Sequence, residues 1–240
     1  MGFAEKSLVW LRFFSQVLDK RLSSIHNVAV RTDWYYPIMS KERLSTNRTR
    51  IIQTAGEMLY RQGYNSTSVD DIAAAAGVSK SNFYYHFPSK EDLGLAVLAV
   101  RRDQLESLLR DTLDEPDTSP IVRLRRFVSA LIERHETQLE RRGCPLGNLV
   151  VEMTEHSERM RCFLSGVFSD LTADLARVIR EAQAKHEVRS DTDADELALL
   201  LVQAIQGMHL VVKCGRDASA ARTSGKVLID LIAMPCAQKH

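Results

Sequence analysis

Apolar residues recur every three or four positions along almost the whole chain from Thr49 onward, and this periodicity constrains the fold more than any other feature. Such spacing places the apolar side chains on one face of a helix. Long stripes of this kind cover residues 160–179 and 197–212. No alternation of apolar and polar residues indicates a strand, and no repeat of fixed period occurs. The sequence therefore predicts an all-α fold.

Composition sets the first limits on function. The 240 residues suffice for one large domain or two small ones, and 45% hydrophobic with 26% charged residues is ordinary for a globular protein. The formal net charge is only +1, so nucleic-acid binding requires a local basic cluster. No run of about 18 uncharged apolar residues occurs, and we therefore expect a cytoplasmic protein with no membrane partner.

Cysteine spacing and the lack of catalytic motifs narrow the classes of function further. The four cysteines are Cys144, Cys162, Cys214 and Cys236. They form no Cys-x-x-Cys pair and accompany no histidine cluster, which argues against a structural zinc site. A disulfide framework is not expected in a long chain of intracellular character. No Ser-His-Asp set, metal motif or phosphate loop stands in a supporting context, so we expect no cofactor, no metal and no enzymatic activity.

Two short helices joined by a tight turn are predicted in the first third of the chain. Ser68, with Asp71 three residues later, resembles a capping box that opens a helix over residues 69–76. Gly77 can take a positive φ at the end of that helix, and Ser79 caps the next one at once. This arrangement has the geometry of a helix-turn-helix, whose second helix can project its first turn into a major groove.

Two further helices flank this element. Residues 49–63 form an amphipathic helix that ends at a glycine. Pro88 interrupts the chain, and Ser89 then caps a long helix that runs to about Asp111. The expected order is thus a three-helix bundle followed by a long connecting helix.

The segment GVSKSNFYYHFPSKEDL, residues 77–93, resembles the signature of the TetR family of bacterial transcriptional regulators. Agreement in spacing, caps and residue classes extends over residues 49–98. The resemblance implies that residues 79–87 form the recognition helix. It also implies a three-helix DNA-binding domain at residues 45–92 and a helical sensor and dimerisation domain at residues 93–240.

The first turn of the recognition helix lies closest to base edges, and Lys80, Ser81 and Asn82 occupy it. Lys80 can donate to guanine or phosphate, and Asn82 can make a paired contact with adenine. The tyrosines and the histidine that follow offer donors to phosphates, as do free amides at capped helix starts. The predicted DNA-binding residues are Arg48, Ser68, Lys80, Ser81, Asn82, Tyr84, Tyr85, His86 and Lys90.

Other residues of the same segment have structural interpretations. The predicted core positions are Ile72, Ala73, Val78, Phe83 and Phe87. Tyr84 is predicted to be shared between core and phosphate contact, whereas Asp70 and Asp71 are caps or solvated charges. Arg48 belongs to a basic arm with Lys41, Arg43 and Arg50. That arm resembles the flexible segment that touches the minor groove in this family, and a merely solvated lead-in is the alternative.

The remaining chain is expected to form the sensor body. Helices are predicted over residues 121–141, 143–155, 157–185, 196–213 and 219–233. The family resemblance implies that the last two pair with their copies in a homodimer, and their apolar character on more than one face supports this. Two-fold symmetry would then set the recognition helices about 34–36 Å apart, one turn of B-DNA.

Residues 143–149, GCPLGNL, are similar to a segment in the branch of the family that contains the electrophile- and oxidant-responsive NemR and acrylate-responsive regulators. Cys144 matches the sensing cysteine of that branch, and Lys213 matches a lysine that the resemblance places near it. A neighbouring cation would lower the thiol pKa and raise the reactive thiolate fraction. The alternative is that Cys144 is a small buried hydrophobe, as free cysteines commonly are.

A reversible ligand pocket is the other candidate sensor. Its predicted lining residues are Leu146, Leu149, Met153, Phe163, Met208 and His209, all of which have a simpler interpretation as helical core. Either sensor could release DNA by tilting the long helix that begins at Ser89 and so changing the spacing of the recognition helices.

The function that follows is sequence-specific DNA binding, with a repressor released by a small molecule or thiol modification as the leading hypothesis. An activator and a ligand-independent DNA-binding protein are the alternatives. Residues 1–44 differ from the rest and contain both tryptophans. They form either an extra helix or upstream sequence, in which case translation starts at Met39.

Overall fold

Nine α-helices and no strand make up the part of the chain that the computed structural model describes, residues 47–137 and 142–233. The helices are α2 (Asn47–Gln62), α3 (Val69–Ala75), α4 (Lys80–His86), α5 (Lys90–Leu113), α6 (Pro120–Thr137), α7 (Pro145–Met153), α8 (Glu158–Ala184), α9 (Ala194–Gly215) and α10 (Ser219–Ile232). The all-α prediction is confirmed. The alternatives for residues 1–44, the arm residues Lys41 and Arg43, and Cys236 lie outside the described residues.

Short-range capping explains where most helices begin. Side-chain oxygens of Ser68, Ser79, Ser89 and Ser157 each accept a hydrogen bond from a backbone amide in the first turn of the helix that follows. These bonds satisfy amides that lack a partner within the helix. The helix predicted from residue 143 begins instead at Pro145, because Gly143 adopts φ +80° and Cys144 is the extended N-cap residue.

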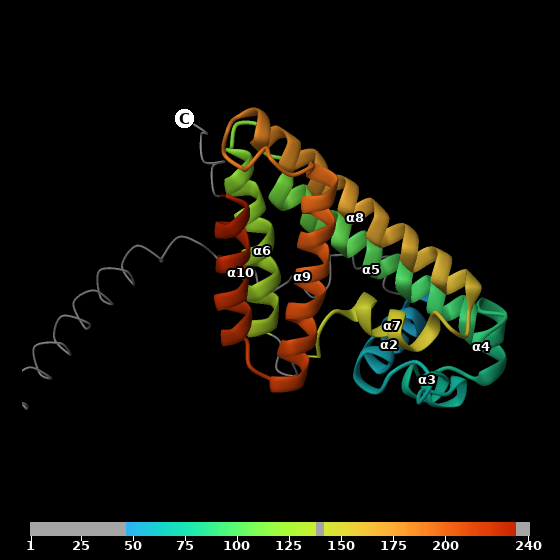
Figure 1. The fold of residues 1–240 in the computed structure, drawn as a ribbon. Coiled ribbons are helices and arrows are strands. Elements are labelled where there is room, and N and C mark those ends of the chain that lie inside the picture. The colour runs from blue at the N-terminus through green and yellow to red at the C-terminus, as the bar shows by residue number, and fades with distance from the viewer. Residues whose placement is uncertain (1–46, 138–141, 234–240) are drawn as a thin grey trace, which may run out of the picture. The chain divides into compact units, whose positions relative to one another are not determined.

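Two apolar cores lie along the fold. One is formed by α2, α3, α4, the first half of α5, α7 and the first half of α8. The other combines the ends of α5 and α8 with α6, α9 and α10. Figure 1 shows α5 and α8 side by side, leading from the small helices α2 to α4 toward α6, α9 and α10. Because both cores include α5 and α8, these helices connect α2, α3 and α4 to the rest of the body.

Helix α9 is the one described helix that is long and apolar enough to cross a membrane by length and composition. Its inner face contributes Leu197, Leu201 and Ile205 to the second core, where it packs against α8 and α10. A core helix has the same composition, and 44% of the apolar window is buried within the protein. Packing against α8 and α10 therefore explains why the buried face of α9 is apolar.

Candidate functional site

Local hydrogen bonds fix the geometry of the α3–turn–α4 element. The Ser68 hydroxyl accepts from the Asp71 amide at 3.0 Å, while the Asp71 carboxylate accepts from the Ser68 amide at 3.2 Å. The Ser68 hydroxyl also donates to the Asp71 carboxylate, and the hydrogen bonds from the hydroxyl and the amide of Ser68 lower the pKa of Asp71. Gly77 takes φ +62° in the turn, and the Val78 amide donates to the Ala73 carbonyl. Helix α4 begins immediately afterwards, with the Ser79 hydroxyl accepting from the Asn82 amide at 3.1 Å.

Helix α4 has an inner and an outer face. Phe83 is fully buried and Phe87 nearly so, in one core with Ile72, as the sequence predicts. Lys80, Ser81, Tyr84 and Tyr85 are exposed, and Tyr85 is 81% exposed. The opening turn of α4 is therefore accessible, as a helix that enters a major groove requires. Contact of these side chains with DNA remains a prediction.

Asn82 is oriented differently from its neighbours on the same turn. Its Oδ1 atom is buried and lacks a hydrogen-bond partner among the described residues. A paired contact with adenine uses both the oxygen and the nitrogen of the amide. Asn82 must therefore rotate about its side-chain bonds before it can make the predicted contact.

Both lysines that are predicted to contact DNA already have partners within the protein. Lys80 forms an ion pair with Asp70 of α3, and this hydrogen-bonded neighbour raises the pKa of Lys80. Lys90 donates to the Tyr64 carbonyl at 2.5 Å and lies 4.2 Å from the centre of the Tyr64 ring. Partial burial lowers the pKa of Lys90, and burial raises the pKa of Tyr64 to about 12. The sequence did not reveal these partners, since Asp70 comes from α3 and Tyr64 from the loop between α2 and α3.

The remaining predicted contacts lie around the ends of α2 and α4. Arg48, in the first turn of α2, places its guanidinium 5.2 Å from the centre of the Phe87 ring. His86 is partly buried and meets the Tyr85 ring edge-on at 5.0 Å between centroids. Ser68 is exposed, but its hydroxyl is used in the capping box. Arg48 and His86 thus lie at the C-terminal end of α4 rather than at its opening turn, and Ser68 caps the preceding helix.

Cys144 caps α7 and its sulfur faces the protein. The Gly147 amide donates to Sγ at 3.3 Å. Burial raises the pKa of the Cys144 thiol, although hydrogen bonds from the Gly147 and Leu146 backbone and from Gln206 act in the opposite direction. The pKa of Cys144 is therefore raised, whereas a neighbouring lysine would lower it. Lys213 does reach α7, but its ammonium donates to Asn148 Oδ1 at 2.8 Å.

The other predicted sensor residues are divided between the two cores. Leu149 and Met153 belong to the core of the DNA-binding helices, together with Leu146. Met208 belongs to the second core, and His209 of α9 is 9% exposed. Their burial agrees with the simpler interpretation as helical core. A ligand role for any of them remains a prediction.

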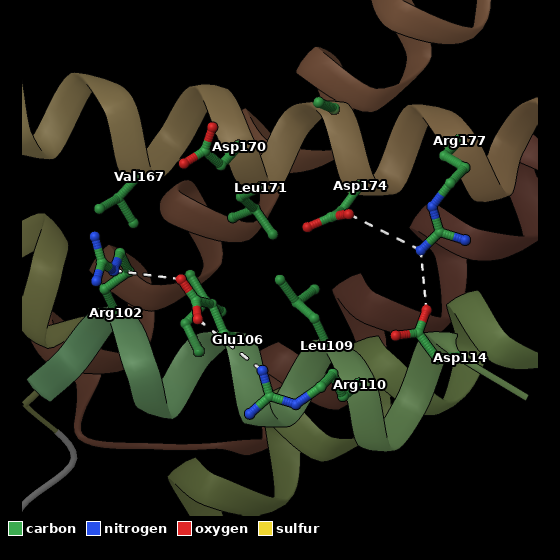
Figure 2. Close-up of a pocket in the computed structure, with 12 residues that line it drawn as sticks. Arg102, Glu106, Leu109, Arg110, Asp114, Val167, Asp170, Leu171, Asp174 and Arg177 are labelled. Atoms are coloured by element: carbon green, nitrogen blue, oxygen red, sulfur yellow. Dashed lines mark hydrogen bonds and ion pairs between the residues drawn. The ribbon is translucent and has the colours of Figure 1, made fainter. Parts of the chain in front are cut away.

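A groove of about 470 Å³ lies between α5 and α8, where no sequence pattern predicts one. Figure 2 shows its apolar floor, which includes Leu109 and Leu171, between charged side chains of both helices. Arg177 joins the walls through an ion pair with Asp114 at 3.0 Å. None of the predicted sensor residues lines this groove. It exists because two helices distant in sequence pack side by side, which local patterns do not encode.

An exposed, capped recognition helix on a larger helical body defines a helix-turn-helix DNA-binding regulator. Comparisons with known proteins agree. Residues 51–97 match the model of bacterial regulatory proteins of the tetR family, and residues 120–227 match that of the tetracyclin repressor-like C-terminal domain. The chain belongs to the TetR family of bacterial transcriptional regulators.

Relatives with names or structures support the same assignment. The transcriptional repressor DhaR of Mycobacterium sp. strain GP1 is 32% identical over 170 residues, which cover 71% of this chain and 84% of DhaR. A crystal structure of the regulatory protein TetR from Rhodobacter sphaeroides is 30% identical, with a TM-score of 0.72 over 78% of this chain and 98% of that one. Reduced Escherichia coli NemR is 20% identical, with a TM-score of 0.73 over 80% of this chain and 99% of NemR, and it shows the shared fold. These relatives are regulators rather than enzymes.

Proposed function

We propose that this regulator is a cytoplasmic homodimeric repressor that binds operator DNA through α4 and is released by a small molecule or by thiol modification. The observation that carries the DNA-binding part is the exposed first turn of α4, held by the Ser79 cap. DhaR, a relative at 32% identity, is named a repressor, and this supports repression over activation.

The outer faces of α9 and α10 support a homodimer. Six large apolar side chains on these helices are about half exposed or more: Leu199, Leu200, Leu210, Val211, Val227 and Leu231. Exposed apolar side chains of this size on two helices that pack together commonly mark a protein interface. Pairing with the same helices of a second copy would cover it and give two recognition helices related by a two-fold axis.

Two effector mechanisms remain as proposals. In the first, Cys144 reacts: its thiol loses a proton, and the thiolate takes an oxygen from a peroxide to give a sulfenic acid and hydroxide. Because burial raises the pKa of this thiol, such a reaction would need the N-terminal end of α7 to open first. In the second, a metabolite binds reversibly beside Leu149, Met153, Met208 or His209 and favours the conformation that does not bind DNA.

Selection of DNA from a random pool tests the DNA-binding proposal. We expect the full chain to enrich a palindromic operator, and Lys80→Ala and Asn82→Ala to weaken operator binding more than binding to random DNA. Lys185→Ala is a matched control, because Lys185 is exposed at the far end of α8. Equal operator affinity in all four proteins would show that α4 does not read the sequence.

The effector proposal needs a separate experiment. Oxidants, electrophiles and metabolites are tested for release of the selected operator by wild type and by Cys144→Ser. Release of wild type alone by an oxidant supports the thiol mechanism, whereas release of both proteins by that oxidant ends it. A reporter gene behind the operator distinguishes repression from activation. Operator binding that no tested compound changes would favour the ligand-independent alternative.

A further inference from the structure

We infer that Asn148 and Tyr60 are positioning residues for DNA binding: with the backbone of residues 142 and 143, they connect the end of α9 to the end of α2. The connection itself does not depend on the proposed homodimer. Its consequence does: if α9 is held at a dimer interface, the connection would orient the DNA-binding helices. The connection is separate from the covalent one through α5.

The first half of the connection joins α9 to the start of α7. Lys213, in the last turn of α9, donates from Nζ to Asn148 Oδ1 at 2.8 Å. Asn148 Nδ2 donates to the Arg142 carbonyl at 3.0 Å. The two bonds fix the orientation of the amide, because Lys213 supplies only donors and the carbonyl only an acceptor. Asn148 thus has a donor and an acceptor engaged with different segments of the chain.

The second half joins the same backbone to α2. Tyr60 Oη donates to the Gly143 carbonyl at 2.8 Å, and the Arg142 guanidinium donates to the Arg61 carbonyl at 2.6 Å. Arg61 lies in the last turn of α2, where carbonyls have no partner within the helix. Residues 142 and 143 therefore supply hydrogen-bond partners to the C-terminal end of α2.

Gly143 makes the connection tight. It is buried with φ +80°, and a Cβ at this position would lie 3.1 Å from the His209 carbonyl oxygen and 3.3 Å from Lys213 Cβ. The Gly143 backbone is thus packed directly against α9 on one side while its carbonyl accepts from Tyr60 on the other. A shift of α9 along this contact would be passed to α2 through a single residue.

The position of α2 matters because it packs on the recognition helix. Helix α2 contacts both α3 and α4, and its residues Ile51 and Leu59 share a core with Phe83 and Phe87 of the α4 region. Close packing transmits displacement rather than absorbing it. At the other end of α7, Glu152 accepts from the Asn65 amide at 3.1 Å, so this short helix is attached to the α2 region at both ends.

Hydrogen exchange and a double-mutant cycle on the full chain test the connection. Lys213→Met removes the donor on α9, and Tyr60→Phe removes the donor on α2 without changing the ring. Lys185→Met is the matched control for charge loss. In the free protein, we expect Lys213→Met to speed amide exchange several-fold in residues 59–63, while Lys185→Met leaves it unchanged. Thermal unfolding measured alongside separates this local effect from global destabilisation, which would speed exchange throughout the chain.

The cycle uses affinity for operator DNA selected from the random pool. We expect each single variant to weaken binding and the double variant to lose much less than the product of the two losses. Independent sites multiply to within about twofold, so a larger departure measures coupling. Asn148→Asp is a second variant in case Lys213→Met does not fold, since it is isosteric and keeps the acceptor for Lys213 but loses the donor to Arg142. Its expected effect on exchange in residues 59–63 is the same.

Unchanged exchange at the end of α2 in the folded variants, or losses of affinity that multiply, overturns the inference. These results are distinct from a failure of the proposed function. If wild type selects no operator, the DNA-reading proposal fails, and hydrogen exchange still decides whether the connection exists.

Discussion

Asp70 Oδ1 lies 2.8 Å from Lys80 Nζ, so a carboxylate of α3 holds the first cation of the recognition helix. Both side chains are well over half exposed, and an ion pair of this kind adds little to stability. In the proposed complex with DNA, a phosphate would have to compete with Asp70 for the ammonium group of Lys80. The pair also keeps a negative charge beside the surface that we propose to face DNA.

Replacing Asp70 by asparagine should therefore strengthen DNA binding. The change frees Lys80 and removes one repulsive charge, so affinity for operator and for random DNA should rise at low salt. The plot of log affinity against log salt should become steeper by up to about one unit. Titrations at several salt concentrations measure both effects. Asp117→Asn, an exposed change between α5 and α6, is the control. A weaker affinity for Asp70→Asn would mean that the pair orients Lys80 for binding.

Two glycines with positive φ offer a matched comparison. Gly77 adopts φ +62° with open space around it, whereas Gly143 adopts φ +80° against the backbone of α9. Alanine at either position should cost about 1–2 kcal/mol for the left-handed conformation. Gly143→Ala should cost more, since its Cβ would also crowd His209 and Lys213. Urea unfolding of the two variants tests this order, and equal destabilisation would mean that α9 moves away without cost.

The cysteines should differ in reactivity toward iodoacetamide. Burial raises the pKa of Cys144, and a hydrogen bond to Glu158 raises the pKa of exposed Cys162. The thiolate is the reactive form, so among the three described cysteines we expect exposed Cys214 to be alkylated first at pH 7 and Cys144 last. Peptide mass spectrometry over time gives the order. Rapid alkylation of Cys144 would show that the start of α7 opens readily, which would favour the thiol sensor.

Substitution of Cys144 by serine should leave the fold intact. The thiol acts as an N-cap that accepts from the Gly147 amide, and serine is among the preferred N-cap residues. We therefore expect a melting temperature equal to or above that of wild type. Cys144→Ala, which cannot cap, is the comparison and should lose about 0.5–2 kcal/mol. If Cys144→Ser lowers the stability as much as Cys144→Ala, the sulfur stabilises α7 by packing and not by capping.

Short-range chemistry explains how much of the fold could be predicted from the sequence. Ser68, Ser79 and Ser89 each cap a helix through an amide three residues away, and both partners are visible in the sequence. The helix boundaries near them were accordingly predicted to within about two residues. The start of α7 was placed two residues too early, although Pro145 is a local signal for it: a proline disfavours the helical conformation of the residue before it, Cys144, and is common at the first position of a helix.

The candidate sites show the limit of such patterns. The exposure of Lys80, Ser81 and Tyr85 follows from helical periodicity once Phe83 is assigned to the core. The partners of Lys80 and Lys90, and the inward-facing oxygen of Asn82, depend on how neighbouring helices pack. The engagement of Lys213 by Asn148 is likewise a contact between segments 65 residues apart. No local signal contains that information.

Acid should selectively weaken the joint between α8 and the start of α5. Arg159 of α8 donates to Glu91 at 2.9 Å and to Asp92 at 3.0 Å, close to where the recognition helix joins α5. Hydrogen bonds from Ser157 and Arg159 lower the pKa of Glu91, and those from Ser89 and Arg159 lower the pKa of Asp92. A carboxylate whose pKa is lower in the folded protein stabilises the fold above its unfolded pKa, and this contribution disappears as pH falls.

Arg159→Gln should therefore lower the melting temperature near neutral pH, by about 1–3 °C for exposed ion pairs in a domain of this size. The difference from wild type should shrink as pH falls below about 4.5, the ordinary value for glutamate, because protonated carboxyls no longer attract Arg159. Melting curves between pH 3 and 7 measure this convergence. Lys226→Gln, an exposed change on α10, should show no comparable dependence on pH. A constant difference at all pH values would mean that Arg159 acts by packing, and that charge does not hold the first turn of α5 against α8.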